Sequence, residues 1–278
     1  MKFISIFLFT FAIYTSSFGQ TDTVTIKPKW NNGDTKKYKI VTSSSVTYSG
    51  KIEESSMTTK LIRINVGETK GGFTEMVWNY EKVEFKDSTS EKNPYKELMN
   101  TVSRNLIVKY TINDNGEIIS INNYNDISNR IKSTTDSTFN VLGKSEKTAV
   151  NPMVKMQIGM IYSTNKQLNN VVLNDIFSFH KLYGIPFVKD KPITIEERSS
   201  GLPNFVDKFN YTLKSIDSSK SKYSIQGEKQ NSSGGSDTKT TLNYEFNFPQ
   251  NWLTEYNSKL ESKVPINIEF FTSIRQIE

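Results

Sequence analysis

The residue types that most enzymes use for catalysis are nearly absent from this chain of 278 residues, which has one histidine, His180, and no cysteine. A Cys-His pair is therefore impossible. A zinc site would need carboxylates for nearly all of its ligands, and a Ser-His-Asp triad would depend on His180. This histidine lies near the C-terminal end of an expected helix, where the helix dipole favours it. We interpret it as structural, and we expect no catalytic residues, no metal and no cofactor.

Two pairs of adjacent acids, Glu53-Glu54 and Glu196-Glu197, have the residue type that glycan hydrolases use for acid-base chemistry. Adjacent residues of a strand point to opposite faces of its sheet. Neither pair therefore converges on one substrate by itself, and we interpret both as solvated charges. A carboxylate-based hydrolase that combines distant acids stays open as a less favoured function.

The segment from Asn113 to Glu117, NDNGE, has the composition of a calcium loop. An EF-hand alignment on Gly116 places Thr111 and Asn122 at the first and last ligand positions, where Asp and Glu are needed. The segment instead predicts a hairpin turn, because Asn, Asp and Gly tolerate the backbone conformation of tight turns.

Apolar side chains in the middle of the chain are the best candidates for a binding site. Methionine adapts its shape to variable ligands, which favours a site for an apolar or lipid-like ligand between helices and sheet. Packing of the same residues in the core is the competing interpretation, and we expect the three tryptophans, Trp30, Trp78 and Trp252, to pack inside. The candidate ligand-binding residues are Met153, Met156, Met160, Ile161, Phe177 and Phe179.

Strands dominate both ends of the chain. From Thr35 to Lys86 apolar and polar residues alternate, which predicts an antiparallel meander of long strands. The phase shifts near Glu81 and Lys82, which indicates a β-bulge. Alternation returns in the last third of the chain, over residues 209–213, 223–225, 242–248 and 266–270.

Helical patterns fill the middle of the chain, over residues 94–104, 127–139, 152–160 and 168–183, and a short helix is expected over 251–260. The sequence therefore predicts an α+β fold. Long antiparallel β meanders form a curved sheet or two packed sheets, and a central block of three to four helices covers one face. We expect residues 20–278 to form a single domain, with a division near residue 190 as the alternative.

Residues 1–19 have the features of a secretory signal. Lys2 precedes an apolar run from Phe3 to Tyr14, and Ser17 and Gly19 stand at the positions that signal peptidase reads before Gln20. The run is too short for a membrane-spanning helix, which needs ~20 residues. We expect a periplasmic or secreted protein with no membrane span, and not a lipoprotein, since no cysteine is available to carry acyl chains.

The formal net charge of +6 does not point to nucleic acid as a partner. Lysines are interleaved with acids, and the arginines, which suit bidentate phosphate contacts, are scattered. They occur at Arg63, Arg104, Arg130, Arg198 and Arg275.

The end of the signal, Phe18-Gly19-Gln20, and the layout of the whole chain resemble secreted and periplasmic proteins of Bacteroidota. The order of strands and helices is also similar, in layout only, to LolA-like periplasmic carriers. That resemblance implies a curved sheet and helices around an apolar cavity for acyl chains. We therefore favour an envelope protein that binds a hydrophobic ligand and is not an enzyme, with a surface interaction or scaffold module of the cell envelope as the alternative.

Overall fold

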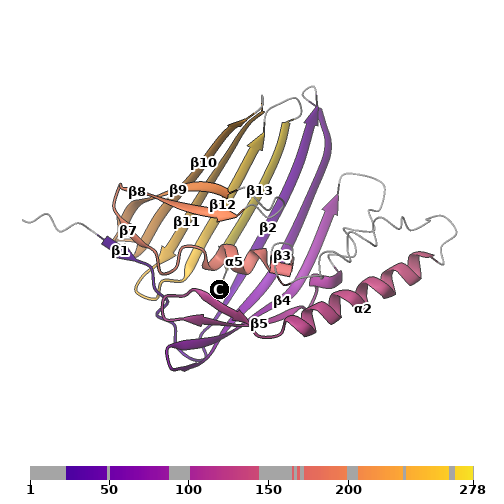
Figure 1. The fold of residues 1–278 in the computed structure, drawn as a ribbon, viewed down its shortest axis with the longest axis horizontal. Helices are drawn as coiled ribbons and strands as arrows, with labels where there is room; N and C mark the ends of the chain where they lie inside the picture. The colour runs from indigo at the N-terminus through magenta and orange to yellow at the C-terminus, as the bar shows by residue number, and fades with distance from the viewer. Residues whose placement is uncertain are drawn as a thin grey trace, which may run out of the picture.

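The computed structural model describes residues 23–48, 51–87, 101–143, 165, 168–169, 172–198, 206–233, 236–262 and 267–277, and shows a mostly β fold (Figure 1). Its strands are β1 (Thr23–Thr25), β2 (Thr35–Tyr48), β3 (Lys51–Lys70), β4 (Phe73–Asp87), β5 (Ile107–Asn113), β6 (Ile118–Ile121), β7 (Pro186–Val188), β8 (Pro192–Arg198), β9 (Val206–Asp217), β10 (Lys222–Ser233), β11 (Ser236–Asn247), β12 (Leu253–Ser262) and β13 (Asn267–Gln276). Its helices include α2 (Tyr124–Gly143) and α5 (Asn174–His180).

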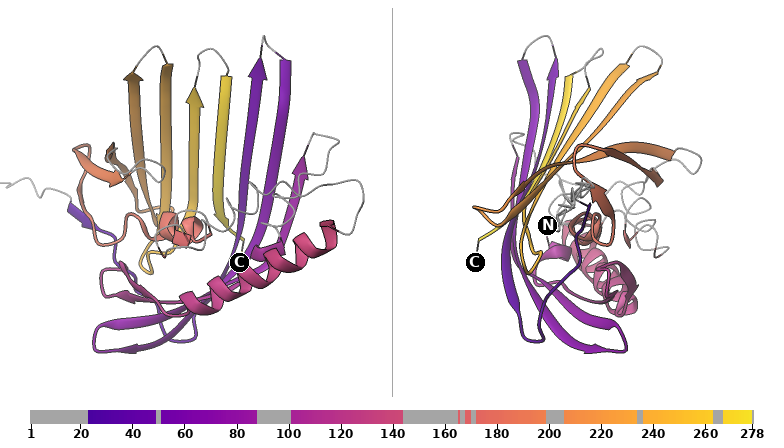
Figure 2. Two further views of the ribbon diagram at one scale, coloured as in Figure 1. Left: turned by 45° about the vertical axis from the view of Figure 1, so that its right-hand side comes forward. Right: turned by 90° about the vertical axis from the view of Figure 1, so that its left-hand side faces the viewer.

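One antiparallel sheet of eleven strands carries both strand-rich parts of the chain, in the order β6-β5-β4-β3-β2-β13-β12-β11-β10-β9-β8. The two parts meet where β2 pairs with β13, from Tyr38 opposite Gln276 to Thr47 opposite Asn267. The sheet is curved and twisted, and both helices lie on the same side of it (Figure 2). We call the side that carries α5 the inner face and the opposite side the outer face. β1 and β7 form a separate two-stranded sheet.

Alternation of residue types explains why the long strands form, as the sequence predicted. In β2, Tyr38 and Ile40 are buried on the inner face, whereas Lys39 between them is exposed. The bulge predicted near Glu81 is confirmed, because Leu61 pairs with Lys82 and Ile62 with Tyr80, which leaves Glu81 as the extra residue. The bulge keeps Tyr80 and Val83 both buried, although an odd number of positions separates them.

The core lies between the inner face and α5 and is rich in aromatic side chains. Phe179 of α5 is fully buried, and its ring meets those of Tyr38 and Trp78 edge to face, with centroids 5.3 and 5.6 Å away. Edge-to-face contact suits the quadrupole of aromatic rings. Replacement of such a ring by Ala costs about 3–5 kcal/mol of folding free energy. Packing against the sheet therefore fixes the position of α5.

Helix α2 confirms the helix predicted over residues 127–139. Ile127, Ile131 and Thr135, three successive turns on one side of the helix, are buried. The Thr135 hydroxyl donates a hydrogen bond of 2.6 Å to the carbonyl of Ile131, so its polar atom is satisfied within the helix.

The predicted α+β class with a central block of helices is wrong, because the protein is mostly β. The stripe predicted as one helix over 168–183 is interrupted. Leu168 and Asn169 are helical and α5 begins at Asn174, but Leu173 directly before α5 has φ −101° and ψ 6°, outside helical geometry. The helix predicted over 251–260 is the strand β12. The helix predicted over 152–160 lies outside the described residues, as does most of the one over 94–104.

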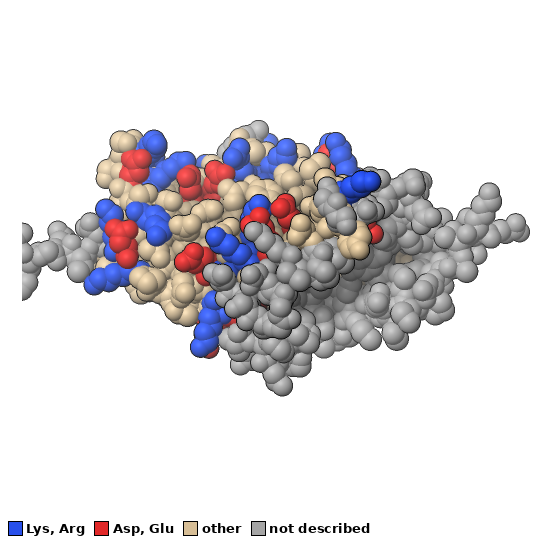
Figure 3. Space-filling view, turned by 90° about the horizontal axis from the view of Figure 1, so that it is seen from above, with Lys and Arg blue, Asp and Glu red and all other residues tan. Residues whose placement is uncertain are grey.

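Charges of both signs are interspersed on the upper surface seen in Figure 3, and Lys and Arg form no continuous stripe among the residues described on that face. Of the helices in the described ranges, none combines the length and apolar character required to cross a bilayer.

Candidate functional site

Side chains on the inner face change character with distance from the core. The register across the sheet aligns them in rows, and successive rows along a strand are about 7 Å apart. The row containing Ile40 and Ile274 belongs to the buried core. The next row contains hydroxyl side chains, and the row after it combines serines with exposed or half-buried apolar residues.

The first row above the core consists of Thr58, Thr42, Thr272 and Ser258, aligned across β3, β2, β13 and β12. We call it the hydroxyl row. All four side chains are half-buried. Those of Thr42, Thr272 and Ser258 make no hydrogen bond within the part of the chain that the structure describes. They are therefore able to donate to, and accept from, a bound molecule.

The next row contains Ser56, Ser44, Phe270 and Leu260. The two serine hydroxyls share a hydrogen bond of 2.7 Å. Phe270 is 49% exposed, although it lies on the face that buries the core. Beyond it, Val46 and Ile268 pair across β2 and β13. The inner face thus presents apolar side chains beyond the hydroxyl row.

A cleft of about 290 Å³ lies where α5 meets the hydroxyl row. Thr42, Ser258 and Thr272 line it from the sheet, and Asn174, Asp175 and Ser178 line it from α5. Lys60 of β3 also reaches the cleft, and its ammonium group donates to Asp175 Oδ2 at 2.6 Å.

Asp175 is a buried carboxylate that already has two donors. Besides Lys60, the Tyr80 hydroxyl donates to its Oδ2 atom at 3.2 Å. Burial, and then the negative charge of Asp175, raise the pKa of Tyr80 well above its usual value, so this hydroxyl stays protonated. Lys60 and Asp175 cancel in charge, and the cleft has no net charge from this pair.

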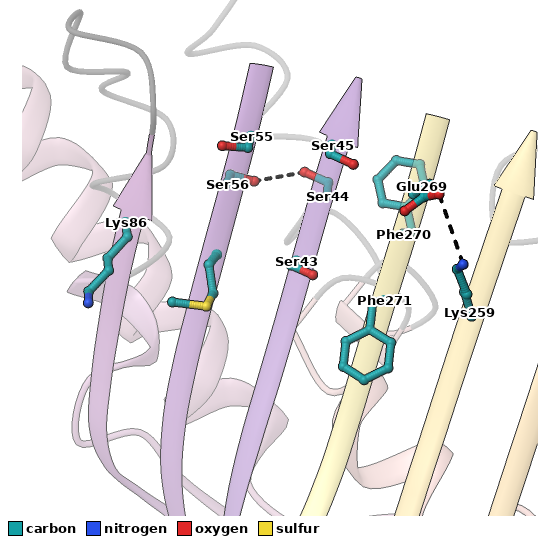
Figure 4. A pocket seen from close by; sticks show the side chains of 11 residues that line it. Ser43, Ser44, Ser45, Ser55, Ser56, Lys86, Lys259, Glu269, Phe270 and Phe271 are labelled. Atoms are coloured by element: carbon teal, nitrogen blue, oxygen red, sulfur yellow. Dashed lines mark hydrogen bonds and ion pairs between the residues drawn. The ribbon is translucent and has the colours of Figure 1, made fainter. Parts of the chain in front are cut away.

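The outer face has a second hollow, of about 440 Å³, shown in Figure 4, and Phe270 and Phe271 are both among the residues that line it. The small side chains of Ser43, Ser45 and Ser55 leave room between Met57 and Phe271, and Phe271 is 37% exposed. Lys86 and Lys259 border the hollow, and Lys259 lies 3.9 Å from Glu269.

Two of the six residues predicted to bind a ligand are described. Phe179 lies in the filled aromatic core, and Phe177 is half-buried and packs against that core. Neither of these two lines the cleft at α5 or the hollow of the outer face. The other four, Met153, Met156, Met160 and Ile161, lie outside the described residues.

His180 is buried and bonded on both sides of its ring. Nδ1 lies 2.9 Å from the carbonyl oxygen of Gly116, which only accepts, so Nδ1 carries the proton. Nε2 then accepts from the Tyr110 hydroxyl at 3.0 Å. Burial lowers the pKa of His180 to about 4, because the charged ring would lose its hydration. Its place in the core agrees with the structural role inferred from the sequence.

The described acids of the two adjacent pairs show no convergence. Glu54 is exposed, and Glu196 is exposed and forms an ion pair of 3.0 Å with Lys208. The side chains of Glu53 and Glu197 are not described. Within the described ranges, no group of three or more His, Asp or Glu residues is placed to hold a metal ion.

The turn and tryptophan predictions are confirmed where the structure describes them. Asn113 to Glu117 joins β5 to β6, with Gly116 at φ +87° and its N–H bonded to the Asn113 carbonyl at 2.8 Å. Trp78 and Trp252 are fully buried, and Trp30, half-buried, stacks on Trp252 with ring centroids 4.1 Å apart.

The hydroxyl row was not found from the sequence. The signal for it was present, because Thr42, Ser258 and Thr272 continue the inward positions that Ile40, Tyr256 and Ile274 occupy. A search for alternating apolar residues does not detect such positions, because Ser and Thr are polar whether they face the core or the solvent. Only the register between distant strands shows that these hydroxyls are neighbours.

No family model and no curated protein matches the chain. Among solved structures, one of lipovitellin, concerning its lipid-protein interactions, has a TM-score of 0.49 and 9% identity, covering 90% of this chain and 26% of that chain. DynF from the dynemicin biosynthesis pathway of Micromonospora chersina has a TM-score of 0.22 and 7% identity, with 92% of this chain and 86% of that one covered. The chain spans about a quarter of the lipovitellin chain. Both similarities are too low to carry a functional conclusion.

Proposed function

We propose that the protein binds an apolar or lipid-like ligand on the inner face of its sheet, beyond the aromatic core. The observation that carries this proposal is the exposure of Phe270, at 49%, on the face where Tyr38, Ile40 and Ile274 are buried. Leu260, Val46 and Ile268 extend the same apolar surface. An acyl chain laid on this surface gains about 0.8 kcal/mol for each methylene group that it removes from water.

The site differs from the one that the sequence predicted. The space between α5 and the lower half of the sheet is filled by Phe179 and its aromatic neighbours. The ligand therefore lies further along the strands, where Phe270 and Leu260 stand above the cleft. The kind of ligand stays as the sequence suggested, and its place moves from the core to the open part of the inner face.

Two adjacent residues of β13 provide a matched test, because Phe270 faces inward and Phe271 outward. We expect cis-parinaric acid to become fluorescent on binding the intact chain, and native mass spectrometry to detect a complex. Phe270→Thr keeps a strand-forming side chain but removes the ring. A half-exposed ring contributes about 1 kcal/mol to binding, so this change raises Kd about fivefold.

Phe271→Thr is the control, and we expect it to leave Kd unchanged. Absence of probe binding to the folded chain would contradict the proposal. So would equal binding by wild-type protein and Phe270→Thr.

The outer hollow supports a second candidate, an interaction module of the cell envelope that works through Met57 and Phe271. Both side chains are apolar and lie on the outer face. Cross-linking in cells distinguishes the two functions. If the outer face is the working surface, Phe271→Thr abolishes recovery of a partner, whereas Leu260→Thr on the inner face, outside the hollow, does not.

We further propose that the protein acts in the periplasm or outside the cell, after cleavage between Gly19 and Gln20. Residues 1–19 support this through their single lysine, apolar run and small residues. The test is the intact mass of the protein purified from its host. A cleaved protein begins at Gln20, and retention of residues 1–19 would overturn the proposal.

A further inference from the structure

We propose that the cleft between α5 and the hydroxyl row holds an uncharged, hydroxyl-bearing head group, such as glycerol or a sugar, of an acyl lipid. This inference rests on the proposed function and assigns the chemical class of its ligand. The cleft and the exposed Phe270 adjoin on the inner face, because Phe270 follows Thr272 two positions along β13. A ligand whose polar end lies in the cleft can therefore place its apolar chain against Phe270 and Leu260.

The side chains that line the cleft match the hydrogen bonding of a polyol. Thr42, Ser258 and Thr272 each offer one donor and acceptor lone pairs. Ser178 adds a fourth hydroxyl, and Asn174 adds an amide with both a donor and an acceptor group. Sugar and glycerol hydroxyls also donate and accept, so they can pair with this set in either direction. The half-buried position of the hydroxyl row makes a ligand that leaves these groups unpaired unfavourable.

The charges of the cleft disfavour an ionised head group. Lys60 and Asp175 lie 2.6 Å apart and satisfy each other, and the side chains are 19% and 10% exposed. An anionic head would compete with Asp175 for Lys60 and would lie beside a buried carboxylate. A cationic head group would compete with Lys60 for Asp175 and would lie beside the ammonium group of Lys60. A charged group loses hydration on entering such a site and receives no opposite net charge in return.

Head-group preference is measured with ligands that share a ten-carbon chain. The intact protein is loaded with cis-parinaric acid, which is displaced by 1-decanoylglycerol, by decanoate, by decylphosphate and by decylamine. We expect 1-decanoylglycerol to bind about tenfold more tightly than each of the three charged ligands, as two well-formed hydrogen bonds would provide. In the variant Thr272→Val with Ser258→Ala, we expect this preference to disappear and the affinity for decanoate to stay the same.

Ser273→Ala is the matched control, because Ser273 neighbours Thr272 on β13 and faces outward. It should retain the tenfold preference. Equal affinities for all four ligands, or tighter binding of a charged one, would overturn the head-group assignment while the proposed function stands. Failure of every ligand and of cis-parinaric acid to bind would instead overturn the proposed function.

Discussion

At the scale of single residues, burial gives the sole histidine a structural role. His180 touches Tyr110 and Gly116 through its two ring nitrogens. Its ring also lies beside those of Trp30 and Phe179, with centroids 6.0 and 5.1 Å away. This buried environment stabilises the neutral imidazole relative to the charged imidazolium. His180 therefore connects α5 to the β5–β6 hairpin, and its titration affects stability.

We predict that the protein loses stability as pH falls from 7 to 5. The pKa of His180 is about 4 in the folded protein and 6.5 in the unfolded chain. Between these two pH values the histidine is protonated in the unfolded chain and neutral in the folded protein, so protonation favours unfolding. The free energy of unfolding should fall by about 2 kcal/mol between pH 7 and pH 5 through this residue alone. Urea unfolding at pH 7, 6 and 5 measures it. In His180→Gln, which does not titrate, the decrease should be smaller by that amount, and an identical pH dependence would contradict the assignment.

At the scale of elements, the turn of the β5–β6 hairpin packs closely against Pro28, which precedes β2, and Tyr183, which follows α5. Its turn glycine, Gly116, has φ +87°, and a Cβ atom there would lie 2.7 Å from side-chain atoms of both Pro28 and Tyr183. The left-handed conformation and the close packing both require glycine. Gly33 has nearly the same φ, +89°, but no atom lies within 4 Å of its hypothetical Cβ.

Comparing Gly116→Ala with Gly33→Ala separates these two causes. Both changes introduce the strain of a left-handed alanine, about 1–2 kcal/mol. Gly116→Ala adds an overlap with Pro28 and Tyr183, which typically costs a further 1–3 kcal/mol. We therefore expect Gly116→Ala to lower the free energy of unfolding by that additional amount in urea titrations. Equal losses would show that the hairpin does not pack closely here.

The sequence predicts the strands best where their inward positions are apolar. Tyr38 and Ile40 in β2, and Tyr244 and Phe246 in β11, make the period of two visible. In β12 the inward positions after Tyr256 are Ser258 and Leu260, so the period is interrupted and the spacing of Trp252 and Leu260 suggested a helix. The hydroxyl row that forms the candidate site is therefore also the reason why its strand was missed.

Two features were beyond reach of the sequence for a different physical reason. The pairing of β2 with β13, and the contact between Lys60 and Asp175, join residues far apart in the chain. Local periodicity contains no information about which distant strands become neighbours. The exposure of Phe270 was likewise invisible, since an inward phenylalanine near the end of a strand looks the same in sequence as one in the core.

At the scale of the whole molecule, the β2–β13 pair makes the two strand-rich parts one continuous sheet. The division near residue 190, which the sequence left open, would correspond to two units that unfold separately. A local perturbation far from β2 distinguishes these alternatives. Gly227 of β10 provides it, because a Cβ atom there would lie 2.5 Å from the ring of the buried Tyr211.

We predict that Gly227→Ala accelerates hydrogen exchange throughout the sheet. The overlap with Tyr211 costs about 1–3 kcal/mol, which corresponds to about a 5- to 150-fold larger population of open states. If the sheet opens as one unit, peptides from β3 and β4 exchange faster by the same factor as those from β10 and β11. Gln226→Ala changes the adjacent, exposed residue of β10 and should leave all rates unaltered. Acceleration that stops between β13 and β2 would instead show two cooperative units meeting at that pair, and the ligand proposed for the inner face would then lie across their junction and stabilise both.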